Sequence, residues 1–156
     1  MPPPRRDPRR VTRSRTRMGN MPASSETSPR SNGVARFTSP FPFQETVQRV
    51  LDTLSGHGIK IFATWDQRAE ARAVGLDMPP TTLIVFGNPK AGTPLMLAQL
   101  ESALDLPLKI LVLESAGEVS VCFNTADYII RRHGLPEQLS SNLAPAFALI
   151  EHVLLA

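Results

Sequence analysis

Short stretches of the chain alternate between apolar and polar residues, and this spacing predicts strands. Alternation predicts strands over residues 34–38, 59–64, 108–114 and 118–123. The run 82–86 is apolar almost throughout, which is typical of a strand that is covered on both faces or lies at the centre of a sheet. Residues 115–117 end in glycine between the last two strands and predict a three-residue hairpin loop.

Apolar residues spaced three and four apart predict helices between these strands. One helix follows Pro42 and ends at Gly56 or Gly58. A short helix or irregular turn is expected over 67–74, and a further helix over 94–104. Asn124 or Thr125 is expected to cap a helix that ends before Gly134. A last helix is expected from residue 136 towards 153, bent at its interior Pro145.

This order of elements predicts the fold class. Hairpin-linked strands pair in antiparallel fashion, and helices that alternate with them can be placed on one side of the sheet. We therefore predict an α+β fold: a two-layer sandwich with a mainly antiparallel sheet and helices on one face. A single domain is expected to span residues 33–156.

Charge is distributed unevenly along the chain. Residues 1–32 hold eight of the 17 Lys and Arg residues and two of the 14 acids, so the remainder is slightly acidic despite a net charge of +3. The first 32 residues also lack an aliphatic cluster, and we predict a disordered basic N-terminal extension. Three interpretations of it stay open: an inert leader with the true start at Met18 or Met21, an arm that binds polyanions weakly, or a targeting segment.

Several classes of function lack support in the residues. No apolar run reaches the roughly 20 residues that span a bilayer. One cysteine, Cys122, and three scattered histidines give no metal-ligand spacing, so neither a metal nor another cofactor is expected. His57 and His133 are interpreted as solvated capping residues, and Cys122 as a structural thiol in a reducing compartment, which favours the cytoplasm.

The candidate site is the segment 87–94, Gly-Asn-Pro-Lys-Ala-Gly-Thr-Pro, which joins the central strand to a helix. Free amides at a helix start attract anions, and the segment adds a lysine. The candidate ligand-binding residues are Asp66, Asn88, Lys90, Gly92 and Thr93. A purely structural interpretation stays open, in which 88–89 form a turn, Gly92 takes a conformation other residues avoid, Thr93 caps the helix and Asp66 caps the preceding one.

The stretch Pro80 to Met96, with Leu104 to Lys109 and the ending Asn124 to Gly134, resembles the bacterial domain-of-unknown-function family numbered 302. The resemblance covers roughly residues 36–134 and implies a small α+β domain, often a homodimer, whose members have no established activity. Some members carry cysteine in place of Gly87 and Leu108, which implies metal or redox chemistry there that this chain does not carry over. Many have Asp-His in place of Asp66-Gln67, so an acid–base role of that histidine is also not carried over.

Three functions remain as hypotheses. The first is a noncatalytic domain that binds a small polar or anionic ligand at segment 87–94. The second is a structural or interaction module without a ligand. The third is an enzyme, for which Asp66 with Lys90 is the one titratable pair that the pattern offers.

Overall fold

The computed structural model describes residues 32–155, with side chains as far as Leu154. Within these residues five strands form one sheet in the order β1-β5-β4-β3-β2, and every neighbouring pair is antiparallel. The strands are β1 (Val34–Thr38), β2 (Lys60–Asp66), β3 (Thr81–Gly87), β4 (Leu108–Ser115) and β5 (Glu118–Asn124). The predicted α+β class is confirmed. The extension predicted for residues 1–32 lies, apart from Asn32, outside the described residues.

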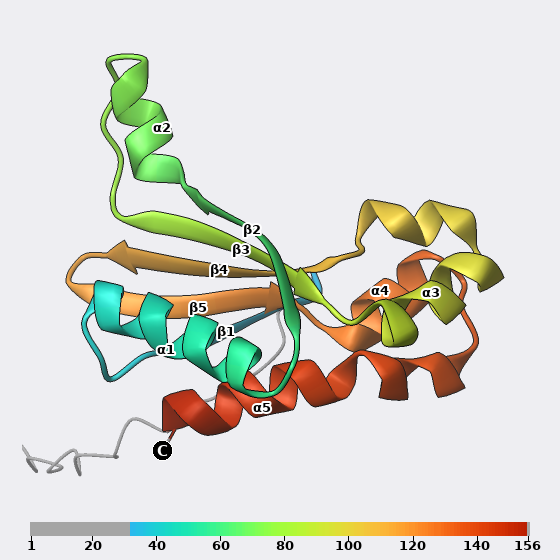
Figure 1. Ribbon diagram of the computed structural model, residues 1–156. Coiled ribbons are helices and arrows are strands. Elements are labelled where there is room, and N and C mark those ends of the chain that lie inside the picture. Colours follow the sequence, from blue (N-terminus) through green and yellow to red (C-terminus); the bar gives the residue numbers. More distant parts are fainter. Residues whose placement is uncertain (1–31, 156) are drawn as a thin grey trace, which may run out of the picture.

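Helices of two kinds connect and cover the strands. The α-helices are α1 (Phe43–Gly56), α2 (Gln67–Ala73), α3 (Pro89–Ala98), α4 (Ala126–Arg132) and α5 (Ala144–Leu155), and two 3-10 helices are η1 (Leu100–Leu104) and η2 (Glu137–Asn142). Figure 1 shows α1 and α5 along one face of the sheet, α2 projecting beyond one end of the strands, and α3 and α4 at the other end. None of the described helices is long and apolar enough to cross a membrane.

Alternation along the strands divides the sheet into a covered and an open face. Ile84, Ile110 and Val121 point to the covered face and are completely buried. Leu54 of α1 and Ile150 of α5 are buried in the same core. On the opposite face, across which Figure 1 shows no helix, most side chains are at least partly exposed. The covered face therefore contains the core, as a one-sided sheet requires.

Four phenylalanines connect α5 to three strands. Phe147 of α5 stacks on Phe123 of β5 at 4.3 Å between ring centroids, and Phe123 stacks on Phe37 of β1 at 5.5 Å. Phe147 also meets Phe86 of β3 edge to face at 6.2 Å. Both arrangements are favourable for aromatic rings. One side chain of the last helix thus joins β3 to β5 and, through Phe123, to the β1 edge of the sheet.

The hairpin between β4 and β5 is tighter than the sequence predicts. Ser115 pairs with Glu118, so only Ala116 and Gly117 form the turn. Both have positive φ, 51° and 77°, as a two-residue turn matching the twist of its strands requires. The predicted three-residue loop is wrong by one residue.

The predicted single helix bent at Pro145 is also wrong. The chain forms η2 up to Asn142 and begins α5 at Ala144. Pro145 therefore lies in the first turn of α5, where a backbone N–H has no partner within the helix and its loss costs little. The proline favours a new helix start over a bend.

Replacing Phe147 should test the role of the aromatic cluster. Phe147→Ala removes a ring that is 6% exposed and should lower the free energy of unfolding by about 3–5 kcal/mol, the usual range for a buried Phe→Ala change. Leu97→Ala, at a side chain that is 77% exposed, is the control and should change it by less than about 0.5 kcal/mol. Urea unfolding measures both, and equal effects would contradict this view of the core.

Candidate functional site

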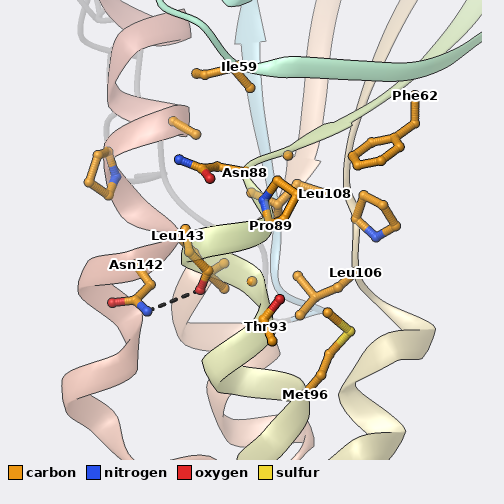
Figure 2. Close-up of a pocket in the computed structure, with 16 residues that line it drawn as sticks. Ile59, Phe62, Asn88, Pro89, Thr93, Met96, Leu106, Leu108, Asn142 and Leu143 are labelled. Carbon is orange, nitrogen blue, oxygen red and sulfur yellow. Dashed lines mark hydrogen bonds between the residues drawn. The ribbon is translucent and has the colours of Figure 1, made fainter.

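A cavity of about 270 Å³ lies at the end of β3, where the chain enters α3 (Figure 2). Four separate segments of the chain contribute its walls. They are the entry to and bulge of β2 with Ile59 and Phe62; the β3–α3 junction with Gly87, Asn88, Pro89, Ala91, Gly92, Thr93 and Met96; the entry to β4 with Leu106, Pro107 and Leu108; and the η2–α5 junction with Asn142, Leu143, Pro145 and Ala146.

Asn88 ends the strand and begins the helix. Its side-chain Oδ1 accepts a hydrogen bond from the Lys90 amide at 3.0 Å. Its main-chain oxygen accepts from the amides of Ala91 and Gly92, both at 2.9 Å. Pro89 occupies the first helical position, where proline is favoured. The helix predicted over 94–104 is therefore wrong at its start: α3 begins at Pro89, and Thr93 does not cap it.

This cap also uses the amides that would hold an anion. Pro89 has no N–H, and the next three amides donate to the two oxygens of Asn88. A helix start attracts an anion chiefly through unpaired amides. The start of α3 therefore has little to offer an anion.

Gly92 lies inside α3 and faces open space. A Cβ built on it would meet no atom within 4 Å, and its φ is not positive, so the predicted special conformation is wrong. A glycine inside a helix is about 0.5–1 kcal/mol less favourable than alanine. At Gly87 a Cβ would lie 3.6 Å from Pro107 and 3.7 Å from the Phe62 ring, an ordinary contact distance. Neither glycine is required by the backbone or by close packing.

Phe62 reaches the cavity through an irregularity in β2. The pairing of β2 with β3 shifts between Ile61 and Ala63, which leaves Phe62 without a partner in the register. Such a bulge re-aims a side chain. Phe62 is 44% exposed and forms one wall of the cavity.

The opposite wall is tied to α3. Asn142 of η2 donates from Nδ2 to the main-chain oxygen of Ala91 at 3.1 Å. Leu143, next to it, is 2% exposed and belongs to both the core and the wall. Figure 2 shows Asn142 and Leu143 on one side of the cavity, with Phe62 and Leu106 on the other.

The structure brings together three of the five residues that the sequence singles out. Asn88, Gly92 and Thr93 line the cavity. Lys90 is exposed on α3 and is not part of the lining. Asp66 caps α2, where its Oδ1 accepts from the Ala69 amide at 2.9 Å.

Asp66 also lies at the other end of the sheet from the cavity. It pairs with Thr82, near the beginning of β3, whereas the cavity adjoins Gly87 at the end of that strand. The two positions are five residue steps apart along β3, a distance of about 17 Å. Asp66 and Lys90 therefore do not converge as an acid–base pair would.

A polar cluster of Asp105, Arg132 and His133 was not predicted from the sequence. Nε2 of His133 lies 2.6 Å from Oδ2 of Asp105, and Arg132 donates to both oxygens of the same carboxylate at 3.2 and 3.1 Å. His133 is the C-cap residue of α4, as expected, but its side chain is 5% exposed, so the expectation that it is solvated is wrong. Because 28 residues separate the pair in sequence, no local spacing signals it. The cluster connects α4 to the residue that directly precedes the Leu106–Leu108 wall.

Residues 32–155 contain no cluster of metal-ligating side chains. No group of three or more His, Cys, Asp or Glu side chains in this part of the chain could hold a metal ion.

Comparison with known proteins gives a family and a fold. The family model described as "Domain of unknown function DUF302" matches residues 35–152. The crystal structure of the uncharacterized conserved protein DUF302 from Bacillus stearothermophilus superposes with a TM-score of 0.67, covering 78% of this chain and 95% of that one. At 16% identity this likeness concerns the fold alone.

Curated relatives carry the name of an ion channel. Over 114 residues the chain is 37% identical to "Fluoride-specific ion channel FluC 1" of Brucella suis biovar 1 (strain 1330) and, equally, to the protein of the same name from Brucella abortus biovar 1 (strain 9-941). The match covers 72% of this chain, but 44% and 42% of those proteins. The chain thus matches less than half the length of these relatives.

Gly92→Ala should stabilise the protein. The new methyl group meets open space and removes the conformational cost of glycine in a helix, so the free energy of unfolding should rise by about 0.5–1 kcal/mol. Gly75→Ala is the contrasting variant and should destabilise, because Gly75 has a φ of 79°. Urea denaturation measures both, and a loss of stability in Gly92→Ala would mean that the space beside it is filled.

Proposed function

The chain belongs to the family described as Domain of unknown function DUF302, and we propose that it is a small-molecule-binding domain whose site is the cavity at the end of β3. Ligand sites are concave and largely preformed, with mainly apolar walls and a few polar groups. The cavity at the β3–α3 junction fits this description, with Asn88 and Thr93 among its polar residues.

The observation that carries the proposal is the open space beside Gly92. A glycine there makes α3 less stable than alanine would, and neither a positive φ nor a close neighbour accounts for it. What its missing side chain provides is room in the cavity. Sites that bind ligands commonly give up stability in this way.

A ligand screen with a blocked variant tests the proposal. Thermal shifts would be measured for phosphates, nucleotides, carboxylates, thiols and uncharged aromatic and aliphatic compounds. A ligand at 100 times its dissociation constant should add about 2.7 kcal/mol of stability. In Gly92→Leu the new side chain enters the cavity, and this shift should disappear.

Gly56→Leu is the matched control for that screen. Gly56 is the last residue of α1 and also has nothing within 4 Å of its Cβ position, but it is not part of the cavity. Its variant should bind as the wild-type protein does. The proposal fails if no compound binds, or if Gly92→Leu and Gly56→Leu retain binding equally.

Fluoride belongs among the test ligands because of the name of the Brucella relatives. The Brucella proteins are called fluoride-specific ion channels, and the matched region is less than half of each. Sodium fluoride, compared with sodium chloride at the same ionic strength, distinguishes a specific effect of fluoride from a general effect of salt.

The open face of the sheet favours a second function, that of an interaction module which pairs two copies of the chain. Trp65, Leu83 and Leu111 are register neighbours across β2, β3 and β4 and form an apolar strip on this face. Trp65 is 49% exposed. No residue of the nearby seven-residue α2 is buried, although isolated helices shorter than about 12 residues are marginal in water. A second copy against this strip would bury both features and form a homodimer.

Sedimentation tests the homodimer. The wild-type chain should sediment as a dimer at micromolar concentration, and Trp65→Glu should sediment as a monomer because it places a charge in the apolar strip. Leu97→Glu, at another exposed apolar residue, is the matched control and should remain dimeric. A monomeric wild-type protein, or dissociation by both variants, would contradict this interface.

A further inference from the structure

The walls of the β3–α3 cavity are almost entirely hydrocarbon. Ile59, Leu106, Leu108 and Leu143 contribute aliphatic side chains from three segments. No Lys, Arg, Asp, Glu or His is among the residues that line it. The body of any molecule that fills this space meets methyl and methylene groups.

The flexible side chain of Met96 and the flat ring of Phe62 complete these walls. Met96 of α3 is flexible and polarizable, which suits it to irregular apolar ligands. The ring of Phe62 offers an aromatic surface on the side opposite Leu143 (Figure 2). A ring or a short hydrocarbon body is the shape that both can contact.

The polar groups of the cavity are few and uncharged. Oδ1 of Asn88 accepts from the Lys90 amide, so its Nδ2 group is the part of that amide left to donate. Thr93 adds a hydroxyl group at an exposed position of the lining. Asn142 already donates to the Ala91 oxygen and thereby ties the wall together.

The cavity offers an anionic group little to offset the loss of its hydration. The first amides of α3 donate to Asn88, and Lys90 does not line the cavity. A charge moved out of water needs a paired charge or several hydrogen bonds to offset its desolvation. The lining has no charged side chain, and the Asn88 Nδ2 group and the Thr93 hydroxyl are the side-chain donors left to it.

We infer that the cavity takes an uncharged organic molecule with an apolar body and a single hydrogen-bonding end, the end lying at Asn88 and Thr93. This inference rests on the proposed function, whose ligand class it narrows. At about 270 Å³ the cavity exceeds the roughly 150 Å³ in which benzene binds, so it can hold a body of one or two rings.

Matched pairs of ligands test the class. Benzamide with benzoate, 2-naphthamide with 2-naphthoate, and octanamide with octanoate each share a body and differ in the charge of the end. Dissociation constants would be measured by calorimetry or ligand-observed NMR at pH 7 on the full chain. The uncharged member of at least one pair should bind at least tenfold more tightly than its anion, and Gly92→Leu should abolish that binding while Gly56→Leu retains it.

Asn88→Asp gives a second, independent measurement. The carboxylate can still cap Lys90, because aspartate is as good a cap as asparagine. It cannot donate to a carbonyl oxygen of the ligand, so acetophenone, which has an acceptor oxygen and no N–H, should bind at least fivefold more weakly at an unchanged unfolding midpoint. Unchanged affinity in this variant would overturn the assignment of the polar end.

The remaining outcomes separate this inference from the proposed function. If an anion binds at least as tightly as its amide and Gly92→Leu abolishes its binding, the inference about class is overturned while the ligand site stands. If no uncharged compound binds, the inference is also overturned. If Gly92→Leu retains all binding, the ligand lies elsewhere and the proposed function fails with it.

Discussion

Asn88 is the single residue between the end of β3 and the start of α3, and its two oxygens accept the hydrogen bonds that start this helix. Because the main-chain oxygen receives two amides and the side chain a third, α3 begins directly at Pro89. The chain therefore leaves β3 already helical, with no intervening loop. The space between this helix, the entry to β4 and the start of α5 is the cavity.

The other walls depend on long-range packing that holds them against this junction. The Phe147 ring of α5 stacks on the Phe123 ring of β5 at 4.3 Å between centroids. This contact positions the residues at the beginning of α5. The Asp105–His133 pair, at 2.6 Å, fixes the chain before Leu106. Hydrogen bonds to charged groups in such buried places contribute about 1.5–3 kcal/mol. The segments that meet at the cavity are thus held in place by contacts outside it. The cavity can therefore stay open although its walls are well packed.

The strands could be predicted from the sequence to within about two residues, because one-sided burial produces a clear alternation in β1 and β4. The start of α3 could not. Asn88-Pro89 and Thr93-Pro94 carry the same signal, a capping side chain followed by proline, and local sequence does not choose between them. Leu95 of α3 is completely buried, and its packing is part of what places the helix start at Pro89 and not at Pro94.

The sequence singles out segment 87–94, most of which lines the cavity, but for a reason that the structure replaces. Free amides suggested an anion, whereas the cap consumes them and the surrounding walls are hydrocarbon. Those walls come from residues near 59, 106 and 143, whose convergence no single-sequence pattern reveals. Asp66 and Lys90 have the residue types of a polar site, yet neither lines the cavity.

Intermolecular NMR contacts test the central claim, that the β3–α3 cavity is a ligand site, most directly. With 2-naphthamide bound to the full chain, the account predicts nuclear Overhauser effects from its ring protons to the ε-methyl of Met96 and the methyls of Ile59 and Leu143, three cavity residues from separate segments. Contacts confined to Leu83 and Leu111 on the open face of the sheet, or none in the cavity, would contradict it.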